Sequence, residues 1–197
     1  MLKKMMLLAS MALAVAAFAV PAIASAEGTL THDSVPVPTN NVVELTLTGF
    51  AEFDVPALDA GYGCDVEATV ELVSGHPSTG TTSFDIVNTE TCVGTGLLAD
   101  CELVEDETNA PYHVAVGSED FTVTKPGGVI EINNLFDEGC IVPAAQLTFN
   151  EVTVTPDDPT SISTVTLSGE GVDDVTGLPI LATGDLDVNP EGTYGIE

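Results

Sequence analysis

Basic residues are almost missing from this chain of 197 residues, which has 31 Asp and Glu against three Lys and Arg. Lys3 and Lys4 lie near the start, so the chain from residue 27 onward has one base, Lys125, against 31 acids, a formal charge of −30. Nucleic-acid binding depends on Lys and Arg that neutralise phosphates, so we expect no nucleic-acid partner. This charge leaves cations, basic proteins and neutral ligands such as sugars as candidate partners.

Aromatic residues are also few, at 5% of the chain, and Trp is absent. A transmembrane β-barrel needs belts of aromatic residues at both membrane interfaces, which this composition does not supply. The only long apolar run lies in the first 26 residues, and no second one follows near the C-terminus. We therefore expect no membrane insertion.

The start of the chain has the pattern of a secretory signal peptide. Met1–Lys4 is positive, MLLASMALAVAAFAV is apolar, and PAIASA ends in the small-x-small pattern of a cleavage site after Ala26. A membrane anchor is the alternative, but Pro21 interrupts the apolar run and no basic stop-transfer flank follows. The sequence thus predicts a secreted protein, with signal peptide 1–26 and a single acidic domain 27–197, a length suited to one domain.

Apolar and polar residues alternate along the rest of the chain with the period of a β-strand. In GCDVEATVELV, residues 63–73, one face is formed by Cys64, Val66, Ala68, Val70 and Leu72. Residues 41–50 place Val43, Leu45 and Leu47 inward in the same way. Further strands are predicted at 81–88, 97–105, 112–117, 120–125, 129–134, 145–155, 161–169, 179–188 and 192–196. Roughly ten short strands separated by turn signals predict an all-β fold, an antiparallel β-sandwich or a partly closed barrel.

Two local signals predict irregular geometry between or within these strands. In KPGG, Pro126 presets the first central position of a type II turn, and Gly127 accepts the positive φ of the second. We expect this turn to join 120–125 and 129–134 in a hairpin. In TFNEVTV the inward parity changes midway, which predicts a β-bulge near Asn150.

Four Cys in an exported chain favour two disulfides over free thiols. Their spacings of 28, 9 and 39 residues match neither the close Cys pairs of zinc sites nor a thioredoxin-like motif. We expect Cys92 to pair with Cys101 across a hairpin tip, and Cys64 to pair with Cys140. The alternative is Cys64 with Cys92, because a hairpin centred near Pro77 would bring these two residues almost opposite each other.

The candidate calcium site lies in GDLDVNPEG, residues 184–192, where oxygen donors alternate. The candidate ligands are Asp185, Asp187, Asn189 and Glu191. Pro190 stands where an EF-hand loop needs its Gly, and Ile196 stands where it needs its bidentate Glu. A strand with its acids facing solvent explains the same pattern, as solvated turns explain the acidic stretches 104–109 and 156–159. Calcium is the one cofactor that the sequence suggests.

No catalytic centre is expected. His32, His76 and His113 are the only histidines and form neither an H-x-H nor an H-x-x-x-H pair. The serines lack the G-x-S-x-G elbow of a nucleophile, and among 31 acids some carboxylate pair is always available, so that count indicates nothing. The chain is therefore predicted not to be an enzyme.

The leader, the four Cys and the segments SFDIVNTETCVGTGLLADCELV and GDLDVNPEGTYGIE resemble a group of small exported proteins of unassigned function found in soil actinobacteria. The resemblance implies an exported all-β domain and supplies no activity.

Three hypotheses for the function follow from these patterns. The leading one is a non-catalytic exported β-sandwich that is structural or binds a neutral or cationic partner outside the cell. The alternative is a calcium-supported adhesion or carbohydrate-binding module, which requires acidic loops that meet at one end of the fold. A secreted hydrolase is third, and it requires a pocket with His76 or His113 beside a Ser or a carboxylate.

Overall fold

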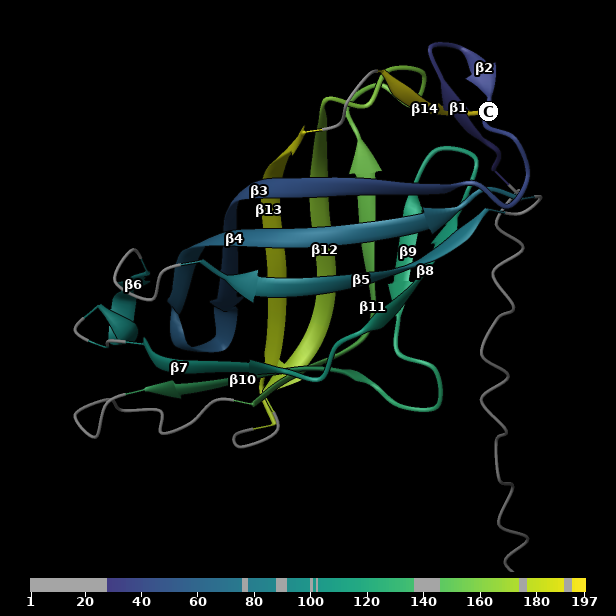
Figure 1. Cartoon of the computed structure of the whole chain (residues 1–197). Helices are drawn as coiled ribbons and strands as arrows, with labels where there is room; N and C mark the ends of the chain where they lie inside the picture. Colours follow the sequence, from purple (N-terminus) through teal and green to yellow (C-terminus); the bar gives the residue numbers. More distant parts are fainter. Residues whose placement is uncertain are drawn as a thin grey trace, which may run out of the picture.

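The computed structural model describes residues 28–75, 78–87, 92–99, 101, 103–136, 146–173, 177–189 and 193–197. The predicted signal peptide lies outside these ranges. Within them the backbone is mainly antiparallel β-strand, which confirms the all-β prediction (Figure 1).

The regular elements follow one another along the chain in two groups. The first half contains β1 (Leu30–His32), β2 (Val35–Pro36), β3 (Val42–Val55), the 3₁₀ turn η1 (Pro56–Leu58), β4 (Ala60–Val73), β5 (Thr79–Ile86), β6 (Val93–Thr95) and the 3₁₀ turn η3 (Gly96–Leu98). The second half contains β7 (Leu103–Thr108), β8 (Tyr112–Val116), β9 (Phe121–Thr124), β10 (Ile130–Phe136), β11 (Gln146–Pro156), β12 (Thr164–Asp173), β13 (Pro179–Asn189) and β14 (Tyr194–Ile196).

Eight of these strands form a closed sheet. Hydrogen-bonded neighbours run in the order β12, β13, β3, β4, β5, β8, β9 and β11, and β11 pairs again with β12. Figure 1 shows β3, β4 and β5 in front, with β11, β12 and β13 crossing steeply behind them. The structure is therefore a barrel flattened into two packed layers, in which each of the eight strands has a hydrogen-bonded neighbour on both sides.

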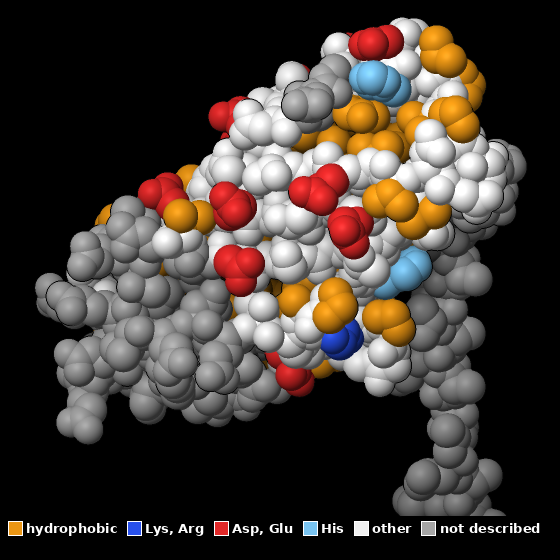
Figure 2. Space-filling view, in the orientation of Figure 1, with side chains coloured by type: hydrophobic (Ala, Val, Ile, Leu, Met, Phe, Trp, Pro, Cys, Tyr) orange, Lys and Arg blue, Asp and Glu red, His pale blue; other side chains and the backbone are white. Residues whose placement is uncertain are grey.

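The long hairpin of β3 and β4 shows how the alternation of the sequence becomes a barrel wall. The two strands pair continuously from Val42 opposite Val73 to Val55 opposite Ala60. Val43, Leu45 and Leu47 are buried, as predicted, while acidic residues of β4 alternate outward. Figure 2 shows such acidic side chains spread over the outer face, so the wall separates an apolar interior from a charged exterior.

Glycine permits the close approach of neighbouring strands at one point of this wall. A Cβ on Gly49 of β3 would lie 2.3 Å from the carbonyl oxygen of Asp185 on β13. A side chain there would force β3 and β13 apart, so this Gly allows the strands to bend tightly around the barrel.

Both local signals are present, but the predicted hairpin is wrong. Gly128 donates its N–H to the carbonyl of Lys125 (3.1 Å), and Gly127 has a φ of 75°, as in the expected turn. However, β9 and β10 do not pair with each other. They lie end to end along one edge of β11, β9 against Glu151–Val154 and β10 against Gln146–Phe149. The two strands meet where the ladder of β11 with β12 shifts register between Phe149 and Val152, which confirms the bulge.

The prediction of a strand at 97–105 is also wrong for the first half of this range. Residues Gly96–Leu98 form η3, and the strand β7 begins only at Leu103. Gly96 has a φ of 58°, a conformation that interrupts a strand. β7 pairs with β10 and not with β5, so the hairpin expected between 81–88 and 97–105 does not form.

A small sheet of β14, β1 and β2 packs on one end of the barrel (Figure 1), and we call it the cap. Leu30 and Ile196 of the cap are buried in the main hydrophobic core. The N–H of Leu30 donates to the hydroxyl of Ser78 (3.4 Å), and the N–H of Ile162 donates to the carbonyl of Tyr194 (2.8 Å). The cap is thus joined to the barrel through both packing and hydrogen bonds. In the part of the chain that the structure describes, no helix is long and apolar enough to cross a membrane.

Candidate functional site: the apolar interior of the barrel

The disulfide Cys64–Cys92 is the alternative pairing that the sequence left open. The favoured pairs, Cys92 with Cys101 and Cys64 with Cys140, are therefore wrong. Cys101 is also disulfide-bonded, whereas Cys140 lies outside the described residues.

Two strands that follow each other along one edge of β4 explain this pairing. Val66 of β4 pairs with Ile86 of β5, and Gly63 of β4 pairs with Val93 of β6. Cys92 directly precedes β6 and so falls opposite Cys64, with the two Cα atoms 4.2 Å apart. The disulfide therefore closes the wall of the barrel where β5 has already ended.

The candidate calcium ligands lie on the outer face of β13. Asp185, Asp187 and Asn189 are exposed and alternate along the strand, whereas Glu191 lies outside the described residues. The hydroxyl of Thr166 donates to Asp185 (2.9 Å), as expected for a cross-strand pair on a solvated face. Among the described residues, no group of three or more His, Cys, Asp and Glu could hold a metal ion. Calcium support therefore stays a prediction.

The described histidines are on separate sheets. His32 lies in the cap and stacks on Tyr194, with ring centroids 4.7 Å apart. His113 lies on β8 of the barrel and is partly exposed. His76 lies outside the described residues, so the pocket required by a hydrolase with His76 is not tested.

The acidic turn at 156–159 uses its carboxylates to hold the backbone. Asp157 accepts the backbone N–H of Thr164 (3.2 Å), and this hydrogen bond lowers the pKa of the Asp157 carboxyl below its ordinary value. Asp158 accepts both the hydroxyl (2.7 Å) and the N–H (2.8 Å) of Thr160, which lowers its pKa in the same way. Because these hydrogen bonds are local, the two acids have a structural role in the turn.

Aromatic rings fill the barrel interior near the turn between β3 and β4. The ring of Phe53 stacks on Tyr62 (5.3 Å) and lies 6.5 Å from the ring of Phe149. A Cβ on Gly171 would lie 2.6 Å from the Phe149 ring, so this Gly leaves room for it. We call this region the packed end, and its residues are Ala51, Phe53, Tyr62, Cys64 and Phe149, each at most 6% exposed. Phe53 and Phe149 also border the cavity described next, so the two regions adjoin.

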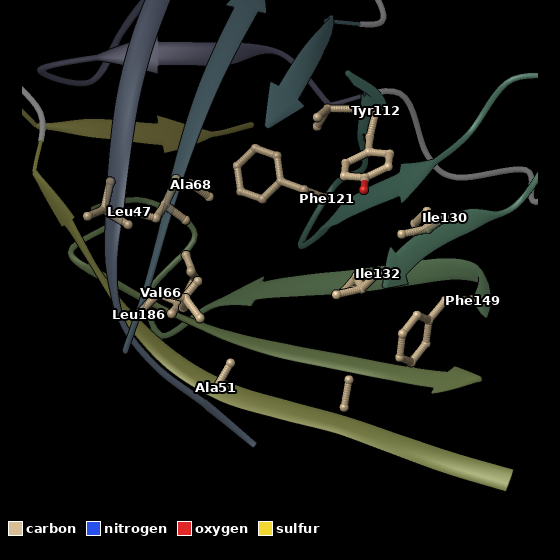
Figure 3. Packing of buried hydrophobic residues seen from close by; sticks show 14 of the residues in the cluster. Leu47, Ala51, Val66, Ala68, Tyr112, Phe121, Ile130, Ile132, Phe149 and Leu186 are labelled. Carbon is tan, nitrogen blue, oxygen red and sulfur yellow. The ribbon is translucent and has the colours of Figure 1, made fainter. Parts of the chain in front are cut away.

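A second region of the interior is less completely filled. Six apolar side chains that line the interior remain partly exposed, and we call them the cavity wall: Val70, Phe84, Val123, Val152, Val154 and Leu167. They share one face of the sheet, as shown by Val152, which pairs with Val123 on one side and Gly169 on the other. They help to enclose a cavity of about 100 Å³ inside the barrel. Figure 3 shows two other lining residues in this interior, with the ring of Phe121 directed towards Ala68 and the ring of Tyr112 beside it.

The polar groups of the cavity lining already have hydrogen-bond partners. The hydroxyl of Thr82 donates to the carbonyl of Ser83 (3.1 Å), and the hydroxyl of Tyr112 donates to the carbonyl of Glu131 (3.2 Å). Every other described lining residue is apolar, and none is charged. Neither His32 nor His113 lines this cavity. The described lining is therefore suited to binding by contact and shape.

The cavity was not predicted from the sequence, although the inward positions of many of its lining residues were. Val70, for example, was expected on the inward face of its strand. The only signal in the sequence was the small residues at inward positions, such as Ala68 and Gly169. Small inward residues also allow strands to approach, so they do not by themselves indicate a cavity.

No family model, no curated protein and no solved structure is significantly similar to this chain.

Proposed function

We propose that the protein is an exported, non-catalytic binding protein that holds an uncharged partner inside its barrel. The observation that carries this proposal is the cavity of about 100 Å³ within a closed sheet, lined almost entirely by apolar side chains. Barrels of about eight strands have an interior just wide enough either to be filled by side chains or to hold one small ligand.

Export is supported by the sequence and by the disulfide. Residues 1–26 have the pattern of a cleaved signal peptide, and Cys64–Cys92 is a bond that persists in oxidising compartments. We therefore propose that the partner is met outside the cytoplasm. The strongly acidic outer face would keep the protein soluble there and repel anionic surfaces.

A binding role is favoured over catalysis by the chemistry of the lining. A hydrolase would need a nucleophile or an acid–base pair at its substrate. The described residues around the cavity supply two hydroxyls, both of which donate to backbone carbonyls.

Thermal unfolding of the oxidised protein, expressed from the full-length chain, tests this proposal. The protein is heated with toluene, with glucose, or with the chlorides of calcium, magnesium and sodium at matched ionic strength. We expect an uncharged organic compound to raise Tm, because a ligand that binds only the folded state stabilises it. Sodium chloride is the reference, since screening of a charge of −30 raises Tm by itself.

Two results would contradict the proposal. A rise in Tm with calcium alone would favour the adhesion or carbohydrate-binding module. Equal shifts in all three salts, with no effect of either organic compound, would favour a structural role.

A further inference from the structure

We infer that the partner held in the barrel is a small hydrocarbon-like molecule about the size of a single aromatic ring, with no charged group. This inference rests on the proposed function and makes it specific, because it names the size and the chemistry of the ligand.

The size of the ligand follows from the volume of the cavity. An engineered cavity of about 150 Å³ lined by apolar side chains stays dry and binds benzene or xenon. The cavity here is smaller, at about 100 Å³, and has the same kind of lining. Xenon and benzene are therefore the appropriate probes, and fused-ring compounds are too large unless the wall moves.

The partial exposure of the cavity wall agrees with the volume of the cavity. Val123 and Val152 face each other on neighbouring strands, yet both keep accessible surface although they point into the barrel. A tightly filled interior would bury them as completely as Val66 and Val116, which are both 1% exposed and do not line the cavity. A ligand in contact with the cavity wall would cover this remaining apolar surface.

The chemistry of the ligand follows from the hydrogen bonds of the lining. The hydroxyls of Thr82 and Tyr112 donate to backbone carbonyls. A polar ligand would therefore lose hydrogen bonds to water and gain few in the cavity. The one cation nearby is Lys125, 5.7 Å from the ring centroid of Tyr112. Its ammonium donates to the carbonyls of Asn109 and Pro111, so it is already engaged outside the cavity.

The net negative charge of the protein also disfavours acidic ligands. The protein from residue 27 onward has a formal charge of −30, and the described lining contains no base. A carboxylate would have to approach against this field and then lose its hydration. Fatty acids and other ionised lipids are therefore poor candidates compared with uncharged hydrocarbons.

The test compares three molecules of similar shape and a matched pair of variants. Binding of benzene, phenol and benzoate to the oxidised protein is measured by ligand-detected NMR, and xenon binding is measured by the shift of the xenon resonance. We expect xenon and benzene to bind. We expect phenol to bind at least about tenfold more weakly than benzene, and benzoate at least about a hundredfold more weakly than benzene.

Val123→Phe places a ring in the cavity, and Thr122→Phe adds the same ring to the outer face of the same strand. We expect Val123→Phe to weaken benzene binding at least about tenfold and Thr122→Phe to leave it unchanged. Should Val123→Phe not fold, Val152→Leu fills part of the same space with one additional methylene, and a smaller loss of affinity is expected.

The outcomes separate this inference from the proposed function. Benzene binding that is equal in the Val123→Phe and Thr122→Phe variants would place the ligand outside the cavity and overturn the inference. A rise in Tm with glucose, without benzene or xenon binding, would support the proposal of an uncharged partner and overturn the inference that this partner is a hydrocarbon. No binding of any uncharged probe would overturn both proposals.

Discussion

The packed end and the cavity wall of this barrel have the same alternation of apolar and polar residues but different packing. At the packed end, Phe53 and Phe149 are 2% and 1% exposed, and Gly171 makes room for the ring of Phe149. At the cavity wall, Phe84 and Val152 also point inward yet remain partly exposed. Alternation therefore determines which side chains enter a barrel, whereas their summed volume determines whether the barrel is full.

Truncation of one Phe in each region is the strongest test of this difference. We expect Phe149→Ala to lower the free energy of unfolding by about 3–5 kcal/mol, because it removes a ring that is 1% exposed. We expect Phe84→Ala to lower the free energy of unfolding by about 1–2 kcal/mol, because part of that side chain is not in contact with other residues. Denaturant unfolding of the oxidised variants measures both values. Equal losses would show that the cavity wall is packed as tightly as the other end.

Loss of the disulfide should affect stability more than binding. Cys64 is completely buried at the packed end, and its bond to Cys92 spans 28 residues. The chain-entropy model predicts that Cys64→Ala with Cys92→Ala lowers the free energy of unfolding by about 3.6 kcal/mol. Because neither Cys lines the cavity, benzene binding to the folded variant should be unchanged. A variant that is fully folded but has lost benzene binding would mean that the two regions are coupled.

Two glycines on β12 provide the finest comparison. Both occupy inward positions, but a Cβ on Gly171 would lie 2.4 Å from the carbonyl oxygen of Thr148, while the nearest atom to a Cβ on Gly169 is the side chain of Val152 at 3.1 Å. We expect Gly171→Ala to cost about 1–3 kcal/mol, because backbone must move, and Gly169→Ala to cost less than about 1 kcal/mol, because Val152 can shift towards the cavity. Thermal unfolding of the two variants side by side measures the difference, and the reverse order would contradict a loosely packed wall.

Much of the fold was predictable because strands have a strict period of two. The inward residues of β3 and β4, the bulge near Asn150 and the turn at Gly127 were all expected from residue types alone. The pairing of β9 with β11 was not, because a turn signal determines the direction of the chain and does not determine the strand beside it. The same limit affected the cysteines, since Cys92 reaches Cys64 only through β6, a strand of three residues.

The candidate site was less predictable than the fold. The inward position of Val152 follows from the shift in parity at the bulge, but the empty volume beside it depends on how eight strands curve together. The acids of β13 were predicted as calcium ligands because carboxylates bind calcium. The structure shows them alternating on the exposed face of a strand. A cavity lined by ordinary apolar residues has no motif, so only a three-dimensional structure can indicate it.

Lys125 has a consequence for the proteolysis of this protein. Proteases with a trypsin-like specificity pocket cut after Lys or Arg, and from residue 27 onward this chain has only Lys125 to offer them. The next residue is Pro126, whose ring and missing N–H make the bond between them a poor substrate, and the ammonium of Lys125 is bound to the carbonyls of Asn109 and Pro111. The scarcity of bases therefore predicts that residues 27–197 resist proteases of this class even when they are unfolded.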